Sequence, residues 1–185
     1  MLTQPPIRRW IGLDLHKAYF MVVGVDAEKR TVLGPRKIPN EELETWIAAQ
    51  LQPTDAVVME MTTNTYLFHD LIAPHVGSVI AVHPPNVRLV TGVRIKTDKK
   101  AALALAQLHA AGLLEPVWIP PVEVRERRAL IAQRGKMVRL ATQAKNRLTS
   151  LLHRTHRKRP EKPFHPAGRA WWESLPLTTL EKHIV

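Results

Sequence analysis

Residues 10–14, Trp-Ile-Gly-Leu-Asp, decide the fold of this chain, because a short apolar run there ends in a carboxylate. A second run of the same kind, Ala-Val-Val-Met-Glu, occupies residues 56–60. Continuous apolar runs of this length are typical of strands buried on both faces of a sheet. A carboxylate at the end of such a strand is costly unless it is paired or binds a cation. The pattern therefore predicts two neighbouring central strands that bring Asp14 and Glu60 together.

Alternating patterns around these runs predict a mixed α/β sheet with helices on its faces. Three strands joined by short connections come first and favour an antiparallel meander. Alternating helices and strands follow, and Asn40 is the predicted cap of the first helix. The predicted strands are 9–15, 19–25, 31–38, 56–60 and 78–82, with 115–119 as an edge strand or linker. The predicted helices are 41–51, 66–75, a short one at 86–91, and 101–112.

A long amphipathic helix is predicted from Val122 to His156. Apolar residues recur there at heptad spacing, including Ile131, Val138 and Leu152, although Lys145 interrupts the row. This stripe is coiled-coil-like and predicts pairing with another helix. The predicted domains are therefore a globular part at 1–120, the basic helix at 121–159, and a segment at 160–185 that begins a further domain.

The positive charge of the chain is concentrated in this helix. The net charge is +11, and the segment 122–159 holds twelve Lys or Arg against two Glu, so it carries ten of those charges. Such a segment repels itself without a polyanion, which favours nucleic-acid phosphate over a merely solvated face. The predicted phosphate contacts are Lys17, Lys96, Arg125, Arg128, Arg134, Arg139, Lys145, Arg147, Arg154 and Arg157.

The composition excludes several classes of protein. There are no cysteines, so disulfide frameworks and zinc–cysteine sites are excluded. No apolar stretch approaches the roughly 18 residues that span a bilayer, and the first nine residues do not resemble a secretory signal. Neither GxxxxGK nor GxGxxG occurs, so phosphate-binding glycine loops are absent. We therefore expect a cytoplasmic protein with no membrane contact.

Three acids on separate predicted elements, Asp14, Glu60 and Asp98, form the candidate site. Magnesium prefers carboxylate oxygens, and two such ions can stabilise the attacking and leaving oxygens of a phosphodiester. Each acid taken alone is explained as well by a turn, a salt bridge or a helix cap. Their occurrence together at two strand ends and a helix start favours a magnesium site.

The residues around these acids resemble one known family. Asp14-x-x-Lys17, then Met59-Glu60 followed by Thr62, Asn64 and Tyr66, then Lys96-Thr97-Asp98, resemble the DEDD transposases of the IS110 insertion-sequence family. The resemblance extends over essentially the whole chain, including Asn146-Arg147-Leu148 in the basic helix. It implies an RNase H-like (RuvC-like) domain in which four acids, Asp-Glu-Asp-Asp, hold magnesium.

Asp14, Glu60 and Asp98 match the first three acids of the family, but the fourth position holds Ala101. Because a methyl group cannot bind a cation, the resemblance implies impaired nuclease activity here. It also implies a bacterial recombinase, guided by a structured bridge RNA, that acts on DNA at the nucleoid. A homo-oligomer formed through the long helix is expected as well. The family carries a further domain with a catalytic serine, and we expect this chain to be the N-terminal part.

Two other classes remain open from the sequence. The chain could be a non-catalytic RNA- or DNA-binding scaffold with a nuclease-like fold. An actin-like sugar kinase or ATPase is the other alternative, because its first strand can read like Gly12-Leu13-Asp14, although glycine-rich phosphate loops are missing.

Overall fold

The computed structural model describes residues 5–85, 97–158 and 160–182. These residues form two compact units, Met1–Ile119 and Pro120–Val185. The predicted short helix at 86–91 and Lys96 lie outside the described residues. Within the described residues, no helix is long and apolar enough to cross a membrane.

The first unit is built on one six-stranded sheet with the order β3-β2-β1-β4-β5-β6. Its strands are β1 (Arg9–Leu15), β2 (Tyr19–Val25), β3 (Thr31–Pro39), β4 (Asp55–Glu60), β5 (Ser78–Val82) and β6 (Pro116–Val117). Strands β1, β2 and β3 pair antiparallel, while β1, β4 and β5 run parallel. This antiparallel meander joined to parallel strands is an RNase H-like sheet, and it confirms the fold class predicted from the sequence.

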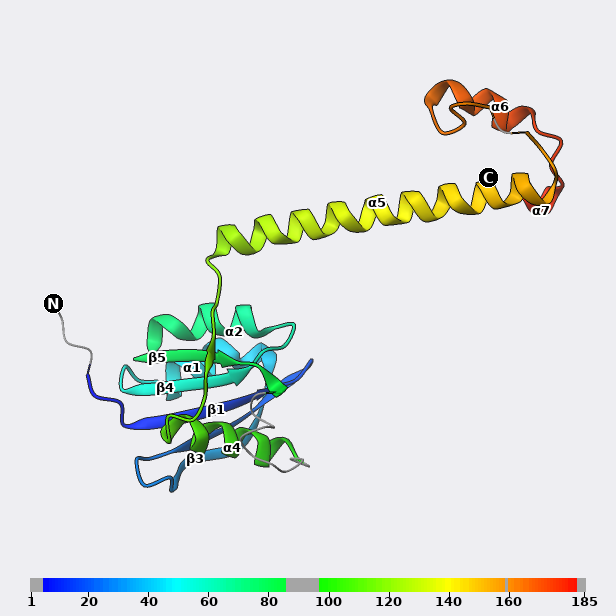
Figure 1. Cartoon of the computed structure of the whole chain (residues 1–185). Helices are drawn as coiled ribbons and strands as arrows, with labels where there is room; N and C mark the ends of the chain where they lie inside the picture. Colours follow the sequence, from blue (N-terminus) through cyan, green and yellow to red (C-terminus); the bar gives the residue numbers. More distant parts are fainter. Residues whose placement is uncertain (1–4, 86–96, 159, 183–185) are drawn as a thin grey trace. The chain divides into compact units, whose positions relative to one another are not determined.

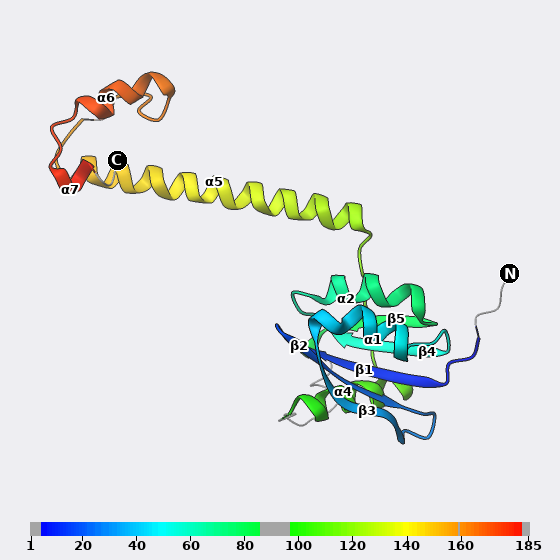
Figure 2. The ribbon, with the colours of Figure 1, turned by 180° about the vertical axis from the view of Figure 1, so that it is seen from behind.

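Helices cover both faces of the sheet (Figure 1). One face packs against α1 (Leu43–Gln50) and α2 (Thr65–Ile72), and α4 (Asp98–Ala110) lies on the other, as the reverse view also shows (Figure 2). Side chains alternate between the two faces of each strand. Leu13 and Met59 belong to the larger core on the first face, whereas Val58 packs with Leu105 of α4 on the second.

Gly12 sets how closely α4 approaches β1. A Cβ atom at this position would overlap the backbone oxygen of Ala102 and would lie 2.7 Å from the backbone nitrogen of Ala106. Only a residue without a side chain therefore permits this contact. The close approach brings the N-terminus of α4 to the end of β1.

An ion pair with a buried carboxylate fixes the start of the two central strands. Arg9 Nε donates to Asp55 Oδ1 and its Nη2 to Asp55 Oδ2, each over 2.7 Å, and Asp55 is completely buried. The Gln52 backbone N–H also donates to Asp55. This bidentate pair holds β1 and β4 in register at the end opposite the candidate site.

Asn40 does not cap the first helix as predicted. A short 3-10 turn, Asn40–Glu42, precedes α1, and no side-chain hydrogen bond caps either. The Asn40 side-chain amide instead donates to the backbone oxygens of His16 and Lys17, each over 3.1 Å. The Asn40 side chain therefore makes long-range hydrogen bonds to the turn at His16 and Lys17, and does not cap the helix as the local pattern predicted.

The second unit is built around the helix α5 (Val122–Arg154), followed by the short helices α6 (Arg169–Ser174) and α7 (Thr179–Lys182). Trp172 of α6 is buried, and its indole N–H donates to the Pro163 backbone oxygen over 2.7 Å. Residues of the tail and of α5 together line a cavity of about 890 Å³. The second unit contains both of the predicted segments, 121–159 and 160–185. The predicted boundary between these two segments therefore stays a prediction.

Candidate metal centre and nucleic-acid surface

The candidate site lies at the end of β1, on the face that α4 covers. Asp14 is two residues after Gly12, so its side chain points to the same face of the sheet. Asp98 is the first residue of α4, behind the N-cap Thr97, whose side chain accepts from the Lys100 backbone N–H over 3.4 Å. The packing at Gly12 therefore joins two acids that are far apart in the sequence.

Asp14, His16 and Asp98 form a cluster in which one potential ligand atom from each lies within 4.8 Å of the others. His16 Nε2 is 3.3 Å from Asp14 Oδ2 and 3.3 Å from Asp98 Oδ2. Neither contact has the alignment of a hydrogen bond, so this buried nitrogen makes none within the described structure. Two carboxylate oxygens and one imidazole nitrogen thus converge on one point.

The two carboxyl groups have opposite electrostatic environments. Burial raises the pKa of Asp14 above its ordinary value; His16 opposes this effect and the Asp98 charge adds to it. The hydrogen bond that Tyr19 Oη donates to Asp98 Oδ2 over 2.8 Å lowers the pKa of Asp98. Asp14 therefore carries its charge at a cost that a bound cation would relieve.

Tyr19 ties Asp98 to the sheet. Its ring stacks on that of His16 with centroids 4.5 Å apart, and Nζ of Lys37 on β3 lies 3.7 Å from its centroid. Because the same ring contacts His16 and binds Asp98, it holds both side chains in position. The sequence assigned no role to Tyr19 or His16, since their relation to Asp98 depends on the docking of α4.

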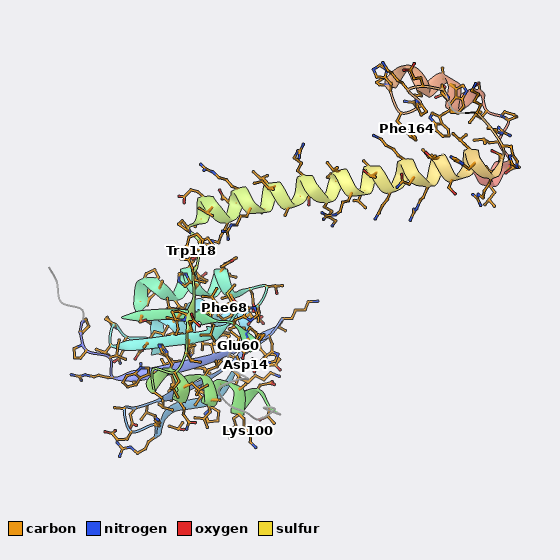
Figure 3. All side chains as sticks on the ribbon, viewed as in Figure 1. Asp14, Glu60, Phe68, Lys100, Trp118 and Phe164 are labelled. Carbon is orange, nitrogen blue, oxygen red and sulfur yellow. The ribbon has the colours of Figure 1, made fainter. Side chains whose placement is uncertain are left out.

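Glu60 ends β4, next to β1. Leu13 pairs with Met59, so Asp14 and Glu60 follow one step later on parallel neighbouring strands. Glu60 also points to the α4 face, because Val58 two residues before it packs there. Figure 3 labels both acids at the same end of the central strands. The Glu60 carboxylate is nevertheless not part of the cluster formed by Asp14, His16 and Asp98.

Ala101 lies one turn along α4 from Asp98, where its backbone N–H donates to the Thr97 oxygen over 3.0 Å. Residues three apart on a helix share a face. The half-buried methyl group of Ala101 therefore lies on the Asp98 face of α4 and offers no ligand atom.

A family model described as "Transposase", for the DEDD transposases of IS110 elements, matches residues 11–157. The chain belongs to this transposase family. The matched span covers the strands that carry Asp14 and Glu60, the helix that carries Asp98, and nearly all of the basic helix.

A solved structure is also similar to this transposase-family chain: "T. thermophilus RuvC in complex with Holliday junction substrate". The similarity covers 60% of this chain and 99% of that one, with 15% sequence identity and a TM-score of 0.41. The comparison with curated proteins gave no match.

The predicted phosphate contacts of this transposase-family chain are mostly exposed. On α5, the side chains of Arg128, Arg134, Arg139, Lys145, Arg147 and Arg154 are exposed, and Arg125 is half-buried. Arg157 is half-buried and donates to the Pro176 backbone oxygen over 2.7 Å. Lys17 is exposed in the turn beside Asp14, and Lys96 lies outside the described residues. Six of the predicted contacts on α5 therefore lie on the exposed surface of the helix.

Proposed function

We propose that this chain is the RuvC-like part of a DNA transposase and recombinase, with a divalent-metal site that acts on DNA phosphodiesters. One observation carries the proposal: in a member of the transposase family, α4 packs so closely on β1 that Asp98 meets Asp14. A helix and a strand that converge on two carboxylates suit metal-assisted strand cleavage better than binding alone.

The residues present fit a magnesium ion. Asp14 and Asp98 supply carboxylate oxygens, and Glu60 on the neighbouring strand is the third acid that we assign to the site. The raised pKa of Asp14 supports the fit, because a cation would offset the cost of its buried charge. When bound, magnesium would supply charge stabilisation at the phosphate, while Tyr19 would hold Asp98 in place.

The alanine at position 101 should weaken this site. The family pattern has an acid here, and the methyl group removes one carboxylate from the Asp98 face of α4. We therefore propose that this chain has little or no nuclease activity and binds magnesium weakly. Strand cleavage and exchange would need the fourth acid.

The test is calorimetric magnesium titration of the Ala101→Asp variant. A gained ligand should tighten magnesium binding by about tenfold or more, which corresponds to about 1.4 kcal/mol. Ala110→Asp is the matched control: it is the same substitution at a half-buried alanine of α4. It lies about 13 Å further along the helix and on the opposite side, so it should give no gain. Equal magnesium binding by both variants would count against the metal site and favour a scaffold that only binds nucleic acid.

We further propose that the basic face of α5 binds nucleic-acid phosphates, in DNA and in a structured guide RNA. The support is charge: exposed arginines and lysines recur along 33 residues of helix. The proposed site of action is the bacterial cytoplasm, on chromosomal DNA. Sequencing of RNA that co-purifies with the protein tests the guide.

The long helix should also join subunits. Several large apolar side chains on α5 are exposed, including Leu130 at 70% and Ile131 at 72%. A stripe of this kind is typical of coiled-coil seams. Ile131→Glu should reduce the mass measured by light scattering, whereas Leu180→Glu, an exposed leucine on α7, should not.

A further inference from the structure

One nitrogen of the His16 ring lies close to both acids of the site. This atom, Nε2, is buried and lies 3.3 Å from a carboxylate oxygen of Asp14 and of Asp98, although 34% of the side chain is exposed. The proposed function uses the acids but gives this nitrogen no role. Its position calls for one, because a buried polar atom without a hydrogen bond is unfavourable.

Two of the three separations between the donor atoms, those measured from His16 Nε2, are those of ligands around one small cation. Ligands about 2.1 Å from an ion lie about 3.0 Å apart when they are adjacent in an octahedron, and about 3.4 Å apart in a tetrahedron. Both separations measured from Nε2 are 3.3 Å. No large movement of His16 is needed to bring its nitrogen to a shared ion.

The turn that carries His16 is held from several sides. Its backbone N–H donates to the Tyr19 oxygen over 2.9 Å, and its backbone oxygen accepts from Asn40 Nδ2 over 3.1 Å and from Asn64 Nδ2 over 3.2 Å. The ring itself stacks on Tyr19. The hydrogen bonds hold the turn and the stacking on Tyr19 orients the ring, as a preorganised ligand requires.

We propose that His16 is a direct ligand of the metal through Nε2, and that it sets which metal this site prefers. The inference rests on the proposed function, since it assumes that Asp14 and Asp98 bind a divalent ion. Two carboxylates and one imidazole suit Mn²⁺ and later first-row ions better than Mg²⁺, which favours oxygen ligands. In this chain the nitrogen takes up part of the role that an acid at position 101 would have.

The experiment compares Mn²⁺ and Mg²⁺ binding by calorimetry, together with pulsed EPR of the Mn²⁺ complex, which detects a directly bound ¹⁴N nucleus. His16→Phe keeps a ring against Tyr19 and removes the nitrogen. We expect its Mn²⁺ affinity to fall about tenfold or more, the ¹⁴N coupling to disappear, and its Mg²⁺ affinity to change much less. His75→Phe, at an exposed histidine of the same unit, should change none of these.

The outcomes separate the inference from the function on which it rests. If Asp14→Asn abolishes Mn²⁺ binding while His16→Phe changes neither affinity nor ¹⁴N coupling, the role of His16 is wrong and the acidic site stands. If His16→Phe binds either metal more tightly than the parent chain, His16 is a competing counter-charge, and the inference is also wrong. If neither the parent chain nor Ala101→Asp binds any metal, the proposed function fails and the inference with it.

Discussion

Asp14 is a carboxylate held where its charge is unfavourable. Only 19% of its side chain is exposed, and the Asp98 carboxylate lies close to the same nitrogen of the His16 ring as Asp14 does. No arginine or lysine pairs with it among the described ion pairs. Such a residue weakens the fold in the absence of a metal, which is a common feature of functional sites.

Asp14→Asn should therefore stabilise the metal-free protein at pH 7. The folded-state pKa of Asp14 lies above its unfolded value, so its charged form destabilises the fold. The gain should shrink as the pH falls towards the unfolded value, where both states bind the proton. We expect Tm to rise by about 2–4 °C, the shift that about 1 kcal/mol produces in a chain of this length. Calorimetry in the presence of EDTA measures it.

Asp26→Asn is the control with the opposite sign. Burial alone would raise the pKa of Asp26, but hydrogen bonds from the Arg30 backbone and guanidinium outweigh it and lower the pKa. Its charge therefore stabilises the fold, and the substitution should lower Tm. A loss of Tm in both variants would contradict this account of Asp14.

His109 of α4 should make the fold sensitive to acid. Burial lowers the pKa of His109 to about 4, and its buried Nδ1 makes no hydrogen bond within the described structure. The unfolded chain binds a proton below about pH 6.5 while the folded chain does not, so stability falls as the pH drops from 6.5 to 4. The expected loss between pH 7 and pH 5 is about 2 kcal/mol.

His109→Leu should remove this loss, as urea unfolding at pH 7 and pH 5 can measure. His153→Leu, at an exposed histidine of α5, should leave the acid dependence unchanged. If the parent chain and His109→Leu lose the same stability between the two pH values, His109 is not the source of the acid sensitivity.

The contact between α4 and β1 depends on a single missing side chain. Gly12→Ala would place a methyl group against the backbone of Ala102 and Ala106, and backbone atoms cannot move aside as a flexible side chain can. Overpacking of this kind costs about 1–3 kcal/mol or more. We expect a lower Tm and weaker metal binding together, because the displaced helix carries Asp98.

Gly135→Ala is the matched substitution. A Cβ atom at Gly135 in α5 would find only the end of the Arg139 side chain, 3.7 Å away. Alanine there should stabilise the helix by about 0.5–1 kcal/mol. A stabilising effect at Gly12 as well would mean that α4 does not pack as described.

The local sequence pattern was sufficient to predict the central strands, but not to predict which side chains meet at the candidate site. Apolar runs predicted β1 and β2 with the bounds that the structure has, and Gly112, with a φ of 68°, ends the α4 region as its sequence suggested. Asn40 was misassigned because its side chain binds a turn 24 residues earlier. The role of His16 was beyond local reasoning for the same reason: its position relative to Asp98 depends on how a distant helix packs.

Most of the net positive charge of the chain lies in its second unit. The exposed arginines and lysines of α5 are opposed only by Glu123 and Glu126 within the helix. A surface of this kind should bind nucleic acid with a steep dependence on salt, because each phosphate contact releases counterions.

Replacing Arg134, Arg139 and Arg147 together by Gln should reduce the slope of log K against log salt by about 2–3 for duplex DNA. Fluorescence anisotropy across a salt series measures this slope. Replacing Lys29, Arg36 and Lys162 by Gln removes the same charge from exposed positions outside the α5 sequence and should leave the slope nearly unchanged. Equal effects would indicate a response to net charge rather than contact with α5.

The hydrogen bond from Tyr19 to Asp98 joins residues that are 79 positions apart. The two acids of the site meet only when α4 docks on the sheet. The site therefore exists only in the fully folded first unit, in which α4 is packed on the sheet. Any ion bound across it would favour the docked state of α4, and slower hydrogen exchange of the α4 amides would follow.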